Sequence, residues 1–197
     1  MGGGYVVVDG QHRLEAAKKH PLIDRLPAYI VSADVAQQAR AFVVLNARRI
    51  GVTRLQRFWA SYAAQDPVAR RIHRICADAG VAITRSGGVL PPRTTYATFT
   101  IERLLPLGGG PITTALKVLA ETHGETRDAF KSPLIYALVQ IAAGQVFSRQ
   151  RLVDVMKTVD LDKLLGDAKS WRAQNGGTLE KATERELRLR YDRRAAA

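Results

Sequence analysis

The residues best suited to chemistry stand together near the start of the chain, in the run Asp9-Gly10-Gln11-His12-Arg13. This run offers a carboxylate, an imidazole that can donate or accept a proton near neutral pH, and a guanidinium that can hold phosphate oxygens with two parallel hydrogen bonds. A glycine at such a place lets the chain turn sharply and lets a ligand approach the backbone. Together these residue types predict a turn that binds phosphate.

A turn of this kind works when a strand ends where a helix begins. The first turn of a helix leaves backbone N–H groups unpaired, and the helix dipole adds partial positive charge there. Tyr5-Val6-Val7-Val8 is a β-branched run that predicts a buried strand, and a helix is expected over 11–20, ended by Pro21. The alternative is a helix-capping Asp9 beside a solvated His-Arg pair, and the chemistry of the residues alone favours neither.

Past this turn the pattern becomes mostly helical. Residues 26–31 predict a second strand, and Ser32 or Asp34 then caps a helix that ends near Asn46. Thr53-Arg54-Leu55-Gln56 matches a capping box, with Leu55, Phe58, Trp59 and Tyr62 as the apolar stripe of the helix that follows. At helical spacing these aromatic side chains favour a place in the core over stacking on bases.

Further capping signals organise the rest of the chain. Asp66-Pro67 places a capping acid before a first-turn proline, which predicts a helix to about Ala79. Ser148 is an expected cap, and Thr183-Glu184-Arg185-Glu186 is another capping-box match. The remaining helices are predicted near 94–105, 111–122, 133–145, 148–157 and 178–193.

These elements predict an α+β fold that is predominantly α-helical. A small partial α/β unit is expected over residues 1–65, followed by a helical domain over 66–197. A helix-turn-helix within 111–157 stays open as an alternative, because no sharp turn signature marks it.

Composition limits the class of protein. Hydrophobic residues make up 46% of the 197, enough for a folded core. The single cysteine, Cys76, excludes an internal disulfide framework and a cysteine-rich zinc site, and we predict that it is a buried thiol on a helix. No apolar run is long enough to span a membrane and no signal peptide is recognised, so a cytoplasmic protein is expected. We assign no resident metal ligand.

Charge is the most informative bulk property, because the chain carries a formal net charge of +12. Such an excess favours a polyanionic partner, most often nucleic acid. Residues 35–77 contain a single acid, Asp66, and many arginines. The residues predicted to contact DNA are Arg48, Arg54, Arg57, Arg70, Arg71, Arg74 and, on the last helix, Arg188. The alternative is a solvated helical face, which would repel itself without a neutralising partner.

The first third of the chain resembles the N-terminal domain of the ParB/sulfiredoxin superfamily. The run from Tyr5 to Lys19 is similar to the strand, Gly-x-x-Arg turn and alanine-rich helix of ParB-type domains, and residues 27–31 are similar to the strand that follows. Leu45-Asn46-Ala47-Arg48-Arg49 is similar to the family's Glu-Asn-x-x-Arg segment, with Leu45 in place of the acid. The Gln-His-Arg version is more similar to phage and mobile-element proteins than to chromosome-partition ParB.

The resemblance implies a nucleotide ligand. In ParB the turn and the Asn-x-x-Arg segment hold the phosphates of CTP with a metal ion, and the nucleotide gates a clamp on DNA. Carried over to this chain, the phosphate-binding residues would be Gly10, Gln11, His12, Arg13, Asn46 and Arg49. Other relatives have been assigned nuclease or ATP-hydrolysing activity, so ATP with Mg²⁺ is an alternative. Sulfiredoxin carries a cysteine where Gln11 stands, which argues against sulfinic-acid reductase chemistry.

One departure from the family pattern affects these expectations. ParB-type domains carry further strands and nucleotide contacts before the turn, whereas here the turn begins at residue 9. The expected sheet would therefore keep two strands with unpaired edges. Either the chain is shortened relative to its natural gene product, or it has lost the front half of the domain, or a partner completes the sheet. Each case lowers the expectation of full nucleotide binding and turnover.

Three functional hypotheses follow. The main one is a ParB-like protein that binds DNA through basic helices and responds to nucleotide, with a homodimer as the expected assembly. The second is a metal-dependent nucleotide hydrolase or nuclease in which Asp9, His12 and Arg13 are the catalytic candidates. The third is a regulator that binds an acidic protein and no nucleic acid.

Overall fold

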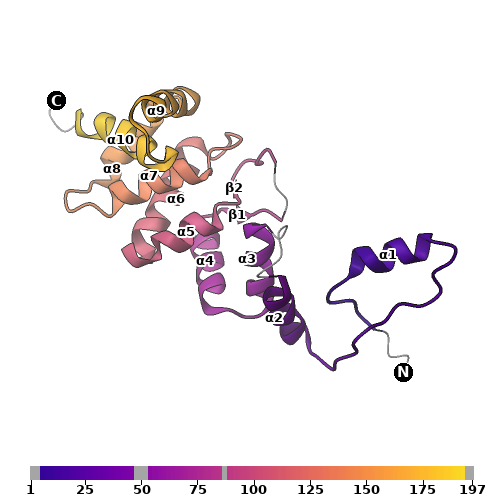
Figure 1. Cartoon of the computed structure of the whole chain (residues 1–197). Coiled ribbons are helices and arrows are strands. Elements are labelled where there is room, and N and C mark those ends of the chain that lie inside the picture. The colour runs from indigo at the N-terminus through magenta and orange to yellow at the C-terminus, as the bar shows by residue number, and fades with distance from the viewer. Residues whose placement is uncertain (1–4, 47–52, 86–87, 194–197) are drawn as a thin grey trace. The chain divides into compact units, whose positions relative to one another are not determined.

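The computed structural model describes residues 5–46, 53–85 and 88–193, and these residues are mainly helical (Figure 1). The chain divides into two compact units, Met1–Ala69 and Arg70–Ala197. Within the described ranges the only sheet is a two-stranded parallel one, so the predominantly helical α+β class is confirmed. In those same ranges, no helix combines the length and the apolar character that a membrane span requires.

The helices in the described part of the first unit are α1 (Gln11–Lys19), α2 (Val35–Asn46), α3 (Arg54–Ala63) and the start of α4 (Pro67–Asp78). The capping box is confirmed, because Gln56 N donates to Thr53 Oγ1 at 3.2 Å and Thr53 N donates to Gln56 Oε1 at 2.9 Å. Asp34 accepts from the N–H of Gln37 at 2.7 Å, so of the two expected caps it serves α2. Helices α2 and α3 pack against each other.

The two strands expected over 5–8 and 26–31 do not form. Neither segment is paired with another part of the described chain, and Figure 1 shows both as irregular chain flanking α1. Tyr5 is 81% exposed and Tyr29 is fully exposed. The prediction was wrong because β-branched and aromatic residues favour a strand only when a neighbouring strand accepts their backbone hydrogen bonds and a core covers one face.

The second unit continues α4 and adds a short sheet and six helices. The strands β1 (Ala82–Ile83) and β2 (Thr94–Thr95) pair in parallel, with Ala82 opposite Thr94. The remaining elements are α5 (Thr98–Leu104), the 3₁₀ turn η1 (Leu105–Leu107), α6 (Gly109–His123), α7 (Ser132–Ala142), α8 (Arg149–Thr158), α9 (Leu161–Asn175) and α10 (Leu179–Arg193). Helices α6, α7, α8 and α10 were predicted with similar bounds. The helix expected near 94–105 begins only at Thr98, because residues 94 and 95 form β2, a strand that was not predicted.

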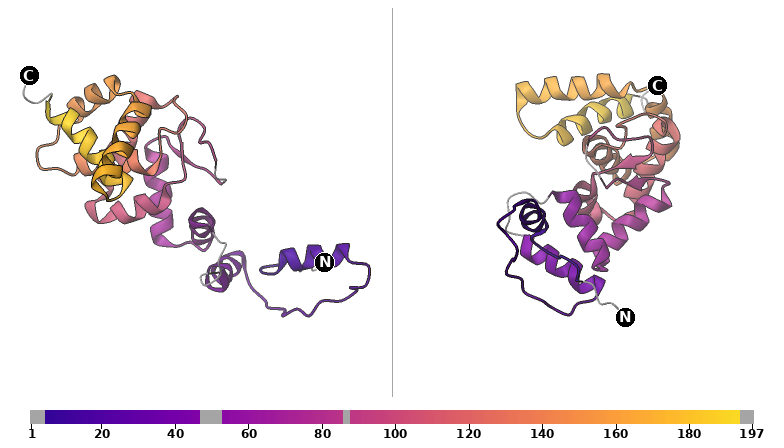
Figure 2. Two further views of the ribbon diagram at one scale, coloured as in Figure 1. Left: turned by 45° about the horizontal axis from the view of Figure 1, so that its top comes forward. Right: turned by 90° about the vertical axis from the view of Figure 1, so that its right-hand side faces the viewer.

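The core of the second unit is organised around α7. Its sequence is apolar nearly all the way round, and Leu134, Ile135, Leu138 and Val139 are completely buried. A helix of this kind is covered on several sides. Accordingly α7 packs against α5, α6 and α10, with α8 reaching the core through α6, as Figures 1 and 2 show from three directions.

The helix expected over 178–193 is confirmed as α10, whereas α9 was not predicted. Helix α9 was missed, although Asp160 caps it by accepting from Asp162 N at 2.9 Å and Lys163 N at 3.0 Å. The capping-box match at Thr183 lies inside α10, where the buried hydroxyl of Thr183 donates to the carbonyl of Leu179 at 2.8 Å. A buried threonine can satisfy its hydroxyl in this way within an unbroken helix.

Two loops of the second unit are joined through Asp128. Its carboxylate accepts from Leu90 N at 2.9 Å and pairs with Lys131 at 3.0 Å, and its own N–H donates to Leu90 O at 3.3 Å. Nearby, the buried hydroxyl of Thr95 donates to Phe130 O at 2.8 Å. Asp128 has a φ of 63°, a left-handed conformation that costs about 1 kcal/mol or more and is held by these bonds.

Asp128 should make stability depend on pH. The backbone N–H of Leu90, and then Lys131, lower the pKa of Asp128 below its ordinary value of 3.8. A lowered pKa adds stability above 3.8 that disappears as the pH falls through the folded-state pKa. We expect Asp128→Asn to lower the free energy of unfolding at pH 7 by about 0.5–1 kcal/mol, since the pair is partly exposed. Urea unfolding from neutral to acid pH measures this difference, which should shrink towards acid; a constant difference would contradict the assignment.

Cys76 should be inert in the folded protein. Its side chain is 1% exposed, which confirms the expected buried thiol, and burial raises its pKa to about 12. A thiol that stays protonated and covered reacts slowly with disulfide reagents. We expect Ellman's reagent at pH 8 to label the native protein far more slowly than the urea-unfolded protein. Equal rates under both conditions would show that Cys76 is accessible.

Candidate phosphate-binding turn and basic surface

The turn before α1 has the glycine geometry expected of it. Gly10 has a φ of 88°, in the left-handed region that glycine adopts without the usual side-chain penalty, and its carbonyl accepts from Leu14 N at 3.0 Å. No side chain of the described residues caps the helix at Gly10. Gln11 and His12, the first two residues of the helix, are exposed.

Arg13 folds back over this turn. A Cβ placed on Gly10 would lie 3.0 Å from Arg13 Nη2, so the guanidinium occupies the space next to the glycine. Arg13 Nη2 also lies 3.9 Å from Asp9 Oδ2, while the Arg13 side chain stays 75% exposed. Asp9 thus pairs with the arginine, and an ion pair this long and exposed holds the guanidinium weakly.

The expected companions of the turn cannot be placed beside it. Asn46 is the last residue of α2, but its side chain lies outside the described residues, as do Arg48 and Arg49. The convergence of Asn46 and Arg49 on the Asp9–Arg13 turn therefore stays a prediction. The same holds for the DNA contact assigned to Arg48.

Helix α3 carries two of the predicted DNA contacts in its first turns. Arg54 and Arg57 are both exposed. On the same helix Phe58 is buried, its ring lies 5.4 Å from that of Trp59, and Trp59 and Tyr62 are half-buried. The aromatic residues thus form a mutually packed cluster, in keeping with a place in the core.

Helix α4 carries three of the other predicted DNA contacts. Arg70, Arg71 and Arg74 are all exposed, and no carboxylate of the described residues forms an ion pair with them. The opposite face of the helix is buried through Ile72, Ile75, Cys76 and Ala79. Helical spacing therefore gathers the three guanidinium groups on the solvent side. We call these three residues the α4 arginine surface.

The start of α6 lies beside this surface. A Cβ on Gly109 would lie 3.6 Å from Ile75 Cδ1 and 3.9 Å from Arg71 Nη2, so the helix begins against α4 next to a guanidinium. No side chain in the described part of the chain caps α6 at Gly108. The unpaired N–H groups of this 15-residue helix add partial positive charge near Arg71.

Arg188 differs from the arginines of α4. Its guanidinium pairs with Glu184 at 2.9 Å within α10. Arg190 pairs with Asp167 at 2.7 Å, and Arg185 pairs with Glu186 and lies over the ring of Trp171. The basic residues of α10 are thus largely neutralised inside the molecule, and Arg188 is the least suited of the predicted DNA contacts.

Two histidines outside the turn, His20 and His123, differ in their surroundings. His20 is exposed. His123 is half-buried: its Nε2 donates to Val159 O at 3.1 Å and its Nδ1 lies 2.9 Å from Thr122 Oγ1. His123 therefore joins the end of α6 to the turn between α8 and α9. Among the described residues, no group of three or more His, Cys, Asp or Glu side chains could hold a metal ion.

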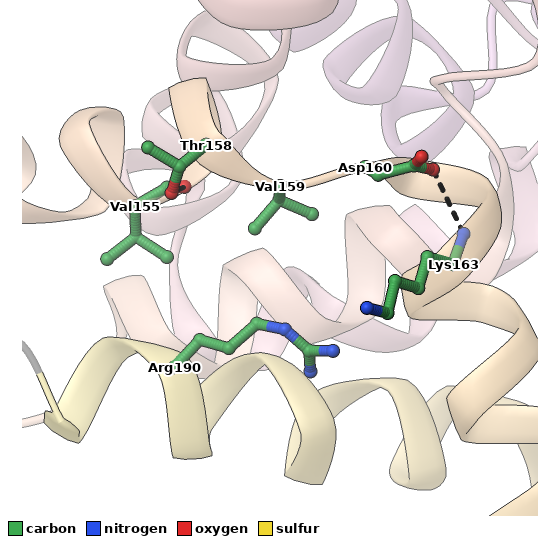
Figure 3. A pocket seen from close by; sticks show the side chains of 6 residues that line it. All are labelled: Val155, Thr158, Val159, Asp160, Lys163 and Arg190. Atoms are coloured by element: carbon green, nitrogen blue, oxygen red, sulfur yellow. Dashed lines mark hydrogen bonds between the residues drawn. The ribbon is translucent and has the colours of Figure 1, made fainter.

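Sequence reasoning missed two adjoining cavities at the joint between α8 and α9. Both are lined by Thr158, Val159 and Asp160, and Figure 3 shows Lys163 and Arg190 extending into the smaller one from α9 and α10. The larger one, which we call the α8–α9 pocket, also receives side chains from the loops at Val89 and Arg127. No motif marks these residues, because they are far apart in the sequence.

The geometry of the turn makes Gly10 sensitive to substitution. Gly10→Ala would place a methyl group in a left-handed conformation and against the Arg13 guanidinium, at a cost of about 1–2 kcal/mol. We expect α1 to fray while the second unit is unaffected. Amide hydrogen exchange should show faster exchange over 14–19 only. Gly176→Ala, at another glycine with positive φ and open surroundings, is the control. Unchanged protection of α1 would contradict the described turn.

Comparison with known proteins gives no relative for this chain: no family model, no curated protein and no solved structure matches it.

Proposed function

We propose that this chain is a DNA-associated protein that binds the phosphate backbone through the α4 arginine surface. The observation that carries the proposal is the exposure of Arg70, Arg71 and Arg74 on one face of one helix without an ion-pair partner among the described residues. Three like charges so close together repel one another until a polyanion neutralises them.

The surroundings of this surface favour phosphate as the group it binds. An arginine forks onto phosphate oxygens with two hydrogen bonds, and backbone N–H groups at a helix start are frequent phosphate contacts in protein–DNA complexes. Arg71 and the uncapped start of α6 supply these two kinds of donor side by side. Such contacts position DNA without reading its sequence, so we expect binding with little base preference.

The first unit adds further cations to this proposal. Arg54 and Arg57 are exposed on α3, and Arg48 belongs to the same predicted set. The resemblance to ParB-type domains supports a second ligand at the Asp9–Arg13 turn, namely a nucleotide such as CTP or ATP with Mg²⁺. In this proposal the turn makes DNA binding responsive to nucleotide, with Gly10, Gln11, His12 and Arg13 as phosphate contacts.

The salt dependence of DNA binding tests the role of α4. Each phosphate that a cation neutralises releases counterions, so removing one such cation reduces the slope of log K against log salt by about 0.9. We expect Arg70→Gln/Arg71→Gln/Arg74→Gln to weaken binding to a fluorescent duplex and to reduce the slope by about 2–3. Fluorescence anisotropy over a series of salt concentrations measures both quantities.

A matched control separates the surface from net charge alone. Lys169→Gln/Arg172→Gln/Lys181→Gln removes three exposed charges from α9 and α10 that have no ion-pair partner in the described part of the chain. It should keep a slope close to that of the wild type. The proposal fails if the wild type has no affinity for DNA at low salt, or if both triple variants lose affinity equally.

A further inference from the structure

The α8–α9 pocket has the size of a small-molecule site. Its volume is about 650 Å³, and the adjoining cavity of Figure 3 adds about 430 Å³. Sites for small ligands commonly measure about 300–1,000 Å³. All of the lining residues belong to the second unit, between Val89 and Arg190, so the pocket is complete within one compact unit.

The pocket has an apolar part. Leu134 is completely buried, Leu161 is nearly so, and Leu165 and Val159 are half-buried. At its edge Val89 is 71% exposed, which leaves an apolar side chain in water that a ligand would cover. Burying apolar area from both partners stabilises a complex by roughly 25 cal/mol for each Å². The apolar side chains that a ligand could cover are therefore mainly Val89, Val159 and Leu165.

The charges around the pocket favour an anion once the paired groups are set aside. Asp128 is engaged by Leu90 N and Lys131, and Asp160 is engaged by the N–H groups of Asp162 and Lys163. The cations without an ion-pair partner among the described residues are Arg127 and Lys157, with Lys163 in the adjoining cavity. Against these three cations stand two exposed carboxylates, those of Asp160 and Asp162. The charge left for a ligand is therefore positive.

Two features give the pocket a defined wall. The Asp128 bonds to Leu90 fix the loop that carries Arg127, and the His123 bond to Val159 O fixes the turn that follows Lys157. The two cations thus project from backbone segments that are tied to the core. A pocket formed before the ligand arrives loses less conformational entropy on binding.

We infer that the α8–α9 pocket binds a small aromatic phosphate, with the ring on the leucine and valine side chains and the phosphate between Arg127 and Lys157. The inference is independent of DNA binding, since it involves none of the three arginines of α4. Aromatic phosphates include both simple aryl phosphates and nucleoside monophosphates. Both classes offer an aromatic ring and a phosphate to the pocket, so the experiment compares a member of each class.

Titration of the ¹⁵N-labelled full chain, followed by NMR, tests this inference. The probes are phenyl phosphate, phenol, inorganic phosphate and adenosine monophosphate. We expect phenyl phosphate to shift the amides of 126–131 and 157–165 with a Kd on the order of 1 mM, as a ligand of its size allows. Phenol and inorganic phosphate should each bind about tenfold more weakly, because each supplies half of the interaction.

Two double variants complete the test. Arg127→Gln/Lys157→Gln should weaken phenyl phosphate binding by about tenfold, since it removes the charge-assisted contacts to the phosphate. Lys117→Gln/Lys169→Gln removes two exposed lysines outside the pocket and should bind as the wild type does. Tighter binding of adenosine monophosphate than of phenyl phosphate would identify nucleotides as the natural class, and the reverse order would identify simple aryl phosphates. The inference would be overturned if inorganic phosphate bound with the same affinity as phenyl phosphate. It would also be overturned if Arg127→Gln/Lys157→Gln bound phenyl phosphate with the affinity of the wild type.

Discussion

Burial of α7 is the constraint on which the second unit depends. Four of its large aliphatic side chains, those of Leu134, Ile135, Leu138 and Val139, are completely buried, and each contributes roughly 1.5–3 kcal/mol by leaving water. A helix that is apolar nearly all the way round must be covered on several sides, so α5, α6 and α10 each turn their own apolar face towards it. The polar residues of these helices are therefore exposed to solvent, and the basic side chains lie on the surface.

The charge of the second unit is divided between two uses. On α10, arginines pair with acids of the same helix or of α9, as Arg188 does with Glu184 and Arg190 with Asp167, and these pairs help to hold the last two helices. On α4 the cations have no such acids among the described residues. The paired arginines of α10 therefore differ in this respect from the arginines of α4, a difference that the net charge of +12 does not reveal.

Features that depend on neighbours in the sequence could be predicted, and features that depend on distant residues could not. The capping box at Thr53, the cap at Ser148 and the buried Cys76 follow from local spacing, and all are present. The strands at 5–8 and 26–31 fail because a strand needs a partner that the local sequence cannot supply. Helix α9 has a local signal in Asp160 and the leucines after it. The signal was not recognised because α9 begins at Leu161, directly after α8 ends at Thr158. The α8–α9 pocket has no local sequence signal, because its lining combines Val89 with residues of α8 and α9 that are distant in the sequence.

The Asp9–Arg13 turn shows how a local motif can keep its shape without the strand expected before it. Its conformation rests on the left-handed Gly10 and on Arg13 folding back over that glycine, and both depend on the backbone of five residues. The 3.9 Å pair between Asp9 and Arg13 is exposed and contributes about 1 kcal/mol at most. A phosphate at the helix start would offer the same guanidinium shorter, charge-assisted hydrogen bonds together with the N–H groups of the first turn. If the turn binds phosphate as we propose, that phosphate would compete with Asp9 for the Arg13 guanidinium.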